Sequence, residues 1–173
     1  MIQGIGRVAG LTLLAMVLWT VPEGSCLSVD ELIIKYTNQE RARAKNRDLK
    51  PLMPSKALTY IALKHSIHQA RTGVMAHEDK KYPTGWRTTA QRFAKIGLSR
   101  SSWAENVFMK YPYGSDDSYA RAAVRWWMNS PPHRANILES RMKYIGVGVS
   151  QSMSKPGLVG YATQAFASSP GSR

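Results

Sequence analysis

The fold is decided by one stretch, Arg125-Trp126-Trp127-Met128-Asn129-Ser130-Pro131-Pro132-His133-Arg134-Ala135-Asn136-Ile137-Leu138. Pro131 must end the helix before it, because proline disfavours the helical conformation in the preceding residue and has no amide hydrogen to donate. Ser130 is then the predicted N-cap of a second, short helix with Pro131 at its first position. The stretch therefore predicts two consecutive helices that meet at Ser130.

The first of these helices has an apolar face. The residues at the spacing of that face are Tyr119, Ala122, Ala123, Trp126, Trp127 and Ser130. Arg121 and Arg125 point away from it, and Ser115 or Asp116 can cap its start. This spacing places both indoles on the face that packs against the core.

His133 falls in the first turn of the second helix, where unpaired amide hydrogens and the positive end of the helix dipole disfavour a charged imidazole. A neutral imidazole at this place could bind a metal or a polar ligand. On spacing alone, a local hydrogen bond is the simpler interpretation.

The remaining pattern predicts further elements. These are helices over 30–47, 55–72 and 88–96, a strand over 103–109, and a closing hairpin of strands over 144–150 and 158–167. Ser55 is the expected cap of the second helix and Gly73 its end. Gly146 and Gly148, on one side of their strand, predict the close approach of another element.

The length of 173 residues is enough for one domain with a core, and the formal charge is +13. Such a surface attracts polyanions. The basic residues are scattered, without a tract or an aromatic-interleaved motif, so we expect no nucleic acid partner.

Residues 1–28 are the predicted secretory signal segment, because Arg7 precedes an apolar run over 8–19 that is too short to span a bilayer. We expect a secreted or periplasmic protein without a transmembrane helix in its mature chain. Cys26 is the only cysteine, so no internal disulfide can form, and a lipid anchor on it is the less favoured alternative. Residues 169–173 are the expected disordered tail.

Three other residues carry possible chemistry. His65 and His68 are three apart on a helix and could bind a metal, but a core-edge residue beside a surface residue is the favoured interpretation. Glu105, in a mostly apolar strand, is either a salt-bridged surface group or a deliberately placed polar group.

Short motifs along the chain occur in an order typical of one known family. They are Asn38-Gln39-Glu40-Arg41, Ala62-Leu63-Lys64-His65-Ser66, His77, Glu105-Asn106-Val107, Trp127-Met128-Asn129-Ser130-Pro131, His133-Arg134-Ala135-Asn136-Ile137-Leu138, Ile145-Gly146-Val147-Gly148 and Thr163-Gln164-Ala165-Phe166. From about residue 30 to 168 the chain resembles the CAP superfamily (cysteine-rich secretory, antigen and pathogenesis-related proteins, with an SCP-like extracellular domain), in its cysteine-poor bacterial branch.

This resemblance implies an α+β fold for residues 29–168, an α-β-α sandwich with a small antiparallel sheet between helical layers. It also implies a central cavity, whose residues here are His77, Glu105, Asn129 and His133. His77 and His133 are the candidate ligands of zinc or another divalent cation. Asn129 replaces the family's second acid, and an amide is a poor metal ligand and no proton acceptor, so it would orient a histidine or a bound water instead.

Three functions fit these residues. The first is a secreted binding module, whose cavity holds a divalent metal or a polar headgroup beside an apolar groove for lipid or peptide. The second is a metal-assisted hydrolase of peptide or cell-wall bonds with Glu105 as general base. Because Glu105 cannot easily be both ligand and base, binding is favoured over catalysis. The third is an envelope interaction protein whose basic surface binds an anionic polymer.

Overall fold

The computed structural model describes residues 26–44, 49–154 and 157–172, so most of the predicted signal segment lies outside the described residues. The elements in chain order are α1 (Val29–Arg43), β1 (Met53–Pro54), α2 (Lys56–Thr72), α3 (Thr89–Ala94), β2 (Trp103–Lys110), α4 (Asp116–Asn129), α5 (Pro131–Ile137), β3 (Tyr144–Ser154) and β4 (Gly157–Ala167). None of the described helices is long and apolar enough to cross a membrane.

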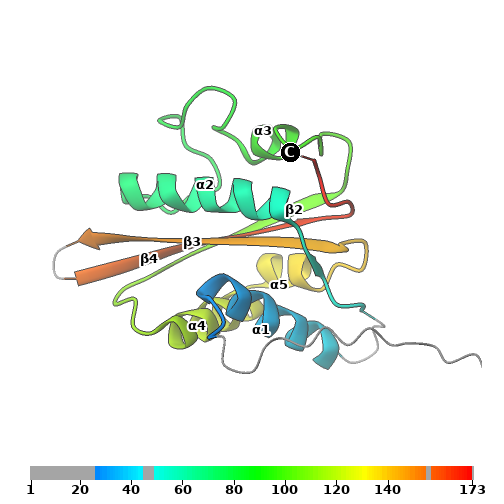
Figure 1. The fold of residues 1–173 in the computed structure, drawn as a ribbon, viewed down its shortest axis with the longest axis horizontal. Coiled ribbons are helices and arrows are strands. Elements are labelled where there is room, and N and C mark those ends of the chain that lie inside the picture. The colour runs from blue at the N-terminus through cyan, green and yellow to red at the C-terminus, as the bar shows by residue number, and fades with distance from the viewer. Residues whose placement is uncertain (1–25, 45–48, 155–156, 173) are drawn as a thin grey trace, which may run out of the picture.

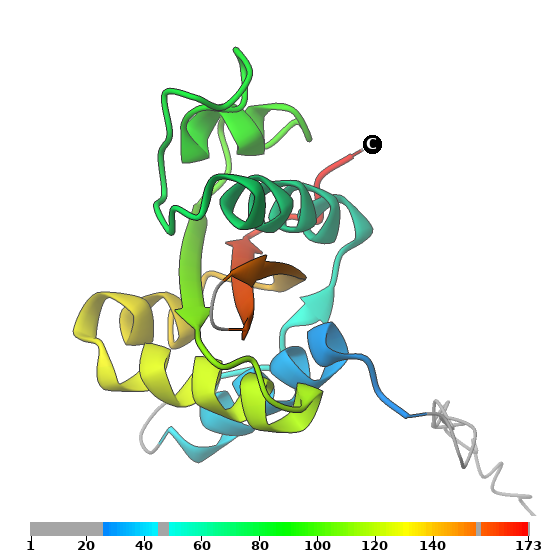
Figure 2. The ribbon, with the colours of Figure 1, turned by 90° about the vertical axis from the view of Figure 1, so that its left-hand side faces the viewer.

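The four strands form one sheet between two helical layers. The strand order is β1-β3-β4-β2, in which β4 pairs antiparallel with both neighbours and β1 runs parallel to β3. α2 and α3 cover one face of the sheet, and α1, α4 and α5 cover the other (Figure 1; Figure 2). The predicted α+β sandwich is confirmed. The sheet is mixed rather than purely antiparallel, because the extended connector before α2 adds the two-residue strand β1.

The limits of α2 and the junction of α4 with α5 follow from the predicted caps, whereas α1 is capped by Ser28 and ends at Arg43, before the predicted limit at residue 47. The Ser55 hydroxyl accepts a hydrogen bond from the Leu58 amide at the start of α2, and Gly73 ends this helix in the left-handed conformation, with φ 71°. α4 and α5 meet at Ser130, with proline at the start of α5. The Ser130 hydroxyl makes no cap hydrogen bond, because it contacts His133 instead.

The larger core lies between the sheet and the layer of α1, α4 and α5. Trp127 is fully buried there, and its indole N–H donates to the Val107 carbonyl oxygen over 2.9 Å. Trp126 does not lie on this buried face of α4, because the residue is 42% exposed. The prediction that both indoles pack on the core face of α4 is therefore wrong for Trp126, because Ala120 and Val124 are buried on the other side of Trp127.

The expected disordered tail is in contact with the domain over its described part. The Ser55 hydroxyl donates to the Pro170 carbonyl oxygen over 2.5 Å, and the Ser172 amide donates to the Ile96 carbonyl oxygen over 3.0 Å. Through these two hydrogen bonds the described part of the tail lies against the start of α2 and the residues that follow α3.

The predicted close approach at the β3 glycines is confirmed. A Cβ atom on Gly146 would lie 2.1 Å from the Thr59 amide nitrogen, and one on Gly148 would lie 2.2 Å from the Leu63 amide nitrogen. The backbone of α2 therefore lies directly on β3, and side chains at these two positions would separate them.

Gly146→Ala is expected to lower the free energy of unfolding by about 2–3 kcal/mol, because the new methyl group meets backbone rather than a flexible side chain. Urea denaturation measures this change. Gly157→Ala is the control, since its Cβ would be 3.2 Å from the ring of the exposed Tyr111, which can move. Equal stability of Gly146→Ala and the wild type would contradict the described packing.

Candidate functional site

Glu105 forms the centre of the site. It lies on β2, and only 3% of its side chain is exposed. Arg92 Nη2 donates to both carboxylate oxygens over 2.8 Å, and Oε1 also accepts from Thr89 Oγ1 over 3.3 Å and from His77 Nδ1 over 3.0 Å. The buried charge is thus compensated by an opposite charge and by neutral donors, as a buried ion pair requires.

Arg92 connects this carboxylate to the loop before α3. Its side chain is fully buried, Nη2 also donates to the His77 carbonyl oxygen over 2.7 Å, and Nη1 donates to the Trp86 carbonyl oxygen over 3.2 Å. α3 begins at Thr88 with a capping box completed by Gln91. One guanidinium group therefore fixes the loop, the helix and the strand relative to one another.

The charge state of Glu105 follows from these contacts. Burial alone would raise the pKa of the carboxyl group, but the hydrogen bond from His77 and the charge of Arg92 outweigh it and hold this pKa below its ordinary value. Glu105 is an anion at neutral pH.

His65 lies beneath the same carboxylate. It is fully buried, and its Nε2 is 3.9 Å from Glu105 Oε1 and 2.9 Å from the Ala76 carbonyl oxygen. Since a carbonyl oxygen only accepts, Nε2 carries the proton, and Nδ1 has no hydrogen-bond partner among the described residues. Burial lowers the pKa of His65 to about 4, so this imidazole is neutral.

His77 and His133 lie at the surface of the site with their rings facing each other, at a centroid distance of 6.3 Å and an interplanar angle of 29°. His77 Nδ1 donates to Glu105, which leaves its Nε2 as a free acceptor on a side chain that is 46% exposed. His133 Nδ1 contacts Ser130 Oγ at 2.8 Å, so here too Nε2 is the nitrogen left for a ligand. Burial lowers the pKa of His133, and the neighbouring His77 lowers it further, which favours the neutral ring.

Trp126 borders this pair of histidines. Its ring centroid is 4.9 Å from that of His133 and 5.8 Å from that of Phe108. The exposed indole thus adds an apolar surface beside the two imidazoles.

A chain of buried amides holds α5, and with it His133, against the sheet. Asn136 Nδ2 donates to Asn106 Oδ1 over 2.9 Å, and Asn106 Nδ2 donates to the His133 carbonyl oxygen over 3.2 Å and to Gln164 Oε1 over 3.0 Å. Gln164 Nε2 in turn donates to Thr37 Oγ1 on α1 over 2.7 Å. These residues position the site without reaching its ligand-binding atoms.

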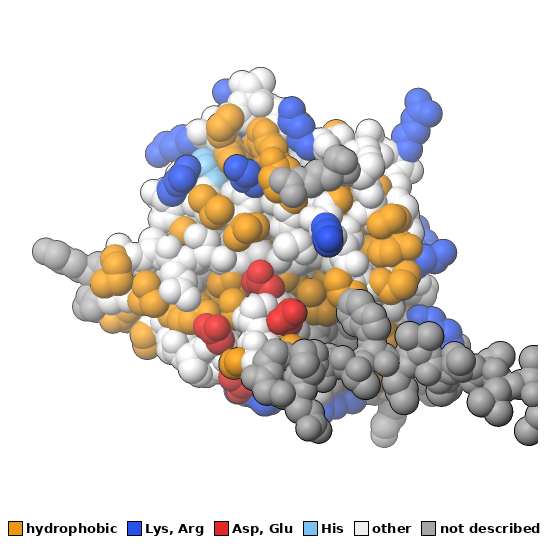
Figure 3. Space-filling view, viewed as in Figure 1, with side chains coloured by type: hydrophobic (Ala, Val, Ile, Leu, Met, Phe, Trp, Pro, Cys, Tyr) orange, Lys and Arg blue, Asp and Glu red, His pale blue; other side chains and the backbone are white. Residues whose placement is uncertain are grey.

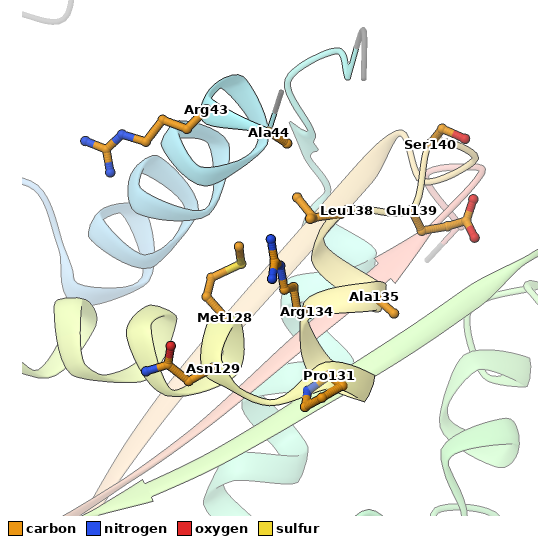
Figure 4. Close-up of a pocket in the computed structure, with 10 residues that line it drawn as sticks. All are labelled: Arg43, Ala44, Met128, Asn129, Pro131, Arg134, Ala135, Leu138, Glu139 and Ser140. Atoms are coloured by element: carbon orange, nitrogen blue, oxygen red, sulfur yellow. The ribbon is translucent and has the colours of Figure 1, made fainter. Parts of the chain in front are cut away.

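Asn129 does not join the other three predicted cavity residues. It is exposed and lines a different depression of about 770 Å³ between α1, α4 and α5, together with Arg43, Met128 and Arg134 (Figure 4). The structure therefore brings together His77, Glu105 and His133 and leaves Asn129 apart. Within 26–44, 49–154 and 157–172, no group of three or more His, Cys, Asp or Glu side chains could hold a metal ion.

Arg92 and Thr89 are neighbours of Glu105 that the sequence analysis missed, and the position of His65 beside this carboxylate was not predicted either. Arg92 carried a usable signal, because Thr89, Arg92 and Phe93 share the buried face of their short helix, and a charge there requires a partner. His65 was interpreted as a core-edge residue and is in fact fully buried, while His68 contacts Asp79 Oδ2 at 2.9 Å. The carboxylate near His65 comes from a strand 40 positions away, which spacing on one helix cannot reveal.

The family model of CAP, the cysteine-rich secretory protein family, matches residues 34–166. The chain belongs to this family. YkwD of Bacillus subtilis (strain 168), described as uncharacterized, is 26% identical over 133 residues, which are 77% of this chain and 47% of YkwD. The chain thus spans about half the length of this curated relative.

Solved structures of other proteins show the same fold. An extracellular protein of Bacillus anthracis that contains an SCP domain superposes with a TM-score of 0.60 at 24% identity, covering 80% of this chain and 40% of that one. An outer surface protein of Borrelia burgdorferi has a TM-score of 0.59 at 15% identity, over 79% of this chain and 89% of that one. NaASP2, in a crystal structure with Zn2+, has a TM-score of 0.55 at 14% identity, over 88% of both chains.

Arg92→Met is expected to cost about 3–5 kcal/mol of unfolding free energy at neutral pH, because it leaves the Glu105 charge buried without its partner. The double variant with Glu105→Gln should recover part of this loss. Urea denaturation of the single and double variants measures the coupling.

Arg87→Met is the matched control, because Arg87 lies in the same segment but is exposed, and its loss should cost less than about 1 kcal/mol. If Arg92→Met is as stable as Arg87→Met, the ion pair does not hold the site together.

His65 should make the protein less stable in mild acid. Its pKa is about 4 in the folded state and 6.5 in the unfolded chain, so between these values only the unfolded state binds the proton, and stability falls as the pH drops from about 6.5 to about 4. The loss can reach about 3 kcal/mol.

Asp30 has the opposite effect over the same range, because burial raises its pKa to about 6. The quantity to measure by urea denaturation is therefore the stability of the wild type minus that of His65→Gln, at pH 7 and pH 4. A difference that does not change with pH would show that His65 is not buried in its neutral form.

Proposed function

We propose that this chain is an exported CAP-domain binding module, whose His77, Glu105 and His133 surface binds a divalent cation or a polar headgroup. The two imidazole Nε2 atoms are the proposed contacts, and Glu105 holds His77 in position. Relatives described as extracellular or outer surface proteins support export, as does the predicted signal segment.

The observation that carries this proposal is the engagement of the Glu105 carboxylate. Both oxygens accept from Arg92, and one of them also accepts from His77 and Thr89. A general base needs a free lone pair and a pKa near the working pH, whereas this carboxyl group has a lowered pKa and few free acceptor positions. The geometry therefore favours binding over hydrolysis with Glu105 as base.

The residues present fit a metal site in which the protein supplies only some of the ligands better than a structural site in which it supplies all four. A carboxylate that accepts from Nδ1 orients an imidazole so that Nε2 can bind a metal, which is the arrangement at His77. Two imidazoles supply two of the usual four zinc ligands and leave the other positions open. A bound cation would supply a positive charge that attracts an anionic or polar group of a ligand.

Calorimetric titration of the purified chain with zinc tests this proposal. We expect one binding event, and a loss of affinity of at least about tenfold in His77→Ala and in His133→Ala, since each removes one of two ligands. His68→Ala is the control, because that imidazole contacts Asp79 outside the site. Identical titrations of wild type, His77→Ala and His133→Ala would contradict the proposal for zinc.

A second candidate function is binding of an anionic envelope polymer through the basic surface. It is favoured by the depression that Asn129 lines, which continues into a neighbouring one of about 360 Å³ through the shared Arg43, Met128 and Asn129. Arg121, Arg125 and Arg134 line the pair of depressions as well, so that four arginines stand against the two acids Glu40 and Glu139. Met128 and Leu138 add apolar surface that a lipid or peptide could contact.

Retention on an anionic polymer that weakens steeply with salt would support this second function. Replacing His77 and His133 together should leave the retention unchanged, whereas replacing Arg125 and Arg134 should reduce it. Loss of retention in the histidine variant would assign polymer binding to the imidazole site instead.

A further inference from the structure

A separate cleft of about 430 Å³ lies between α2 and the segment that leads to α3. α2 contributes one stripe of side chains at helical spacing, which includes Tyr60, Lys64, His68 and Arg71. Tyr82 and Trp86 come from the other side. The cleft shares none of its lining residues with the His77 and His133 pair, so its function does not depend on theirs.

The aromatic side of the cleft is fixed before any ligand arrives. The Tyr82 ring stacks on His68 with centroids 3.9 Å apart and an interplanar angle of 12°, and its hydroxyl donates to the Lys64 carbonyl oxygen over 2.7 Å. The Trp86 carbonyl oxygen accepts from the buried Arg92. A preorganised cleft loses little conformational entropy on binding.

Trp86 offers an apolar surface to a ring-shaped ligand. Its ring centroid is 5.9 Å from that of Tyr60 at an interplanar angle of 74°, and 6.0 Å from that of Tyr82 at 43°. Trp86 and Tyr60 are only partly buried, so part of each side chain is open to solvent. These contacts hold the indole in place, and its solvent-exposed part is an apolar surface on which a ring can pack.

The rim of the cleft is cationic. Lys64 Nζ lies 5.9 Å from the Tyr60 ring centroid, and Lys64 and Arg71 are both exposed. Neither Asp nor Glu is among the described residues that line the cleft. Figure 3 shows hydrophobic side chains over α2 interspersed with Lys and Arg, whereas Asp and Glu gather closer to α1 and α4. A ligand that stacks here would meet positive charge at its polar edge.

We propose that this cleft binds a small ring compound that carries a carboxylate, with an acidic sugar as the fitting occupant. The ring stacks on Trp86, and Lys64 and Arg71 pair with the carboxylate. The volume is within the range of small-molecule sites, which combine aromatic walls with a few polar groups.

The test is a titration monitored by the indole N–H signals in ¹⁵N NMR spectra. N-acetylmuramic acid and N-acetylglucosamine are the probes, since the first differs from the second by a carboxylate-bearing ether. The Trp86 signal should move saturably with the acid, and the acid should bind about threefold more tightly than the neutral sugar, as expected for exposed ion pairs. The variant with Lys64→Gln and Arg71→Gln should abolish this difference.

Trp86→Ala should remove binding, and Trp126→Ala, at the exposed indole beside His133, should leave it unchanged. If Trp86→Ala fails to fold, the double variant Lys64→Gln with Arg71→Gln still tests the proposal. It should fold, because both side chains are exposed. A third probe, 4-hydroxyphenylacetate, carries a carboxylate on an aromatic ring. If it binds more tightly than N-acetylmuramic acid, the site for a ring with a carboxylate is supported, and its ligand has an aromatic ring. An unchanged Trp86 signal, or equal affinity of the wild type for both sugars, would overturn the proposal.

Discussion

The buried ion pair between Arg92 and Glu105 is the interaction on which the rest of the site depends. Both side chains are almost completely excluded from solvent, and Arg92 also binds the carbonyl oxygens of His77 and Trp86. A buried charge is tolerated only when its partners are in place, so this pair forms only if α3, β2 and the loop between α2 and α3 take their described positions. The positions of α3, β2 and this loop are therefore coupled to the charge state of the Glu105 carboxylate.

The same pair limits the chemistry that the site can perform. A carboxylate that accepts from a guanidinium group, a threonine and a histidine is well suited to orient that histidine and poorly suited to accept a proton from a substrate. The reactive atoms that remain accessible are imidazole nitrogens, which bind cations and polar groups. Membership of the CAP family does not decide among these uses, because one fold supports many functions.

Much of the fold was predictable from local stereochemistry. The break at Ser130 follows from Pro131, and the limits of α2 follow from Ser55 and Gly73. Gly146 predicted the close approach of another element to β3, which the structure identifies as α2. In each case one residue has a specific local role: proline cannot continue a helix, serine caps one, and glycine allows a left-handed turn or a close approach of another backbone. The two-residue strand β1 was not predictable, because it is too short to show periodicity.

The site was predictable only in part, because it depends on which residues meet across elements. His77, Glu105 and His133 were found by motif, and the structure brings them together. Asn129 was placed with them wrongly, because the orientation of a residue at the end of a helix depends on how that helix packs, and Asn129 lines the depression between α1, α4 and α5 instead. Arg92 was missed because its partner is on another element. A charge on the apolar face of a helix is the signal that points to such a pair.

The most direct test of this account is the pKa of Glu105, measured from the chemical shift of its carboxyl carbon by ¹³C NMR. If Arg92 keeps the Glu105 carboxylate ionised, this signal should not titrate between about pH 8 and pH 5. A pKa within that range, as a general acid or base needs, would contradict the account and restore hydrolysis as the leading function.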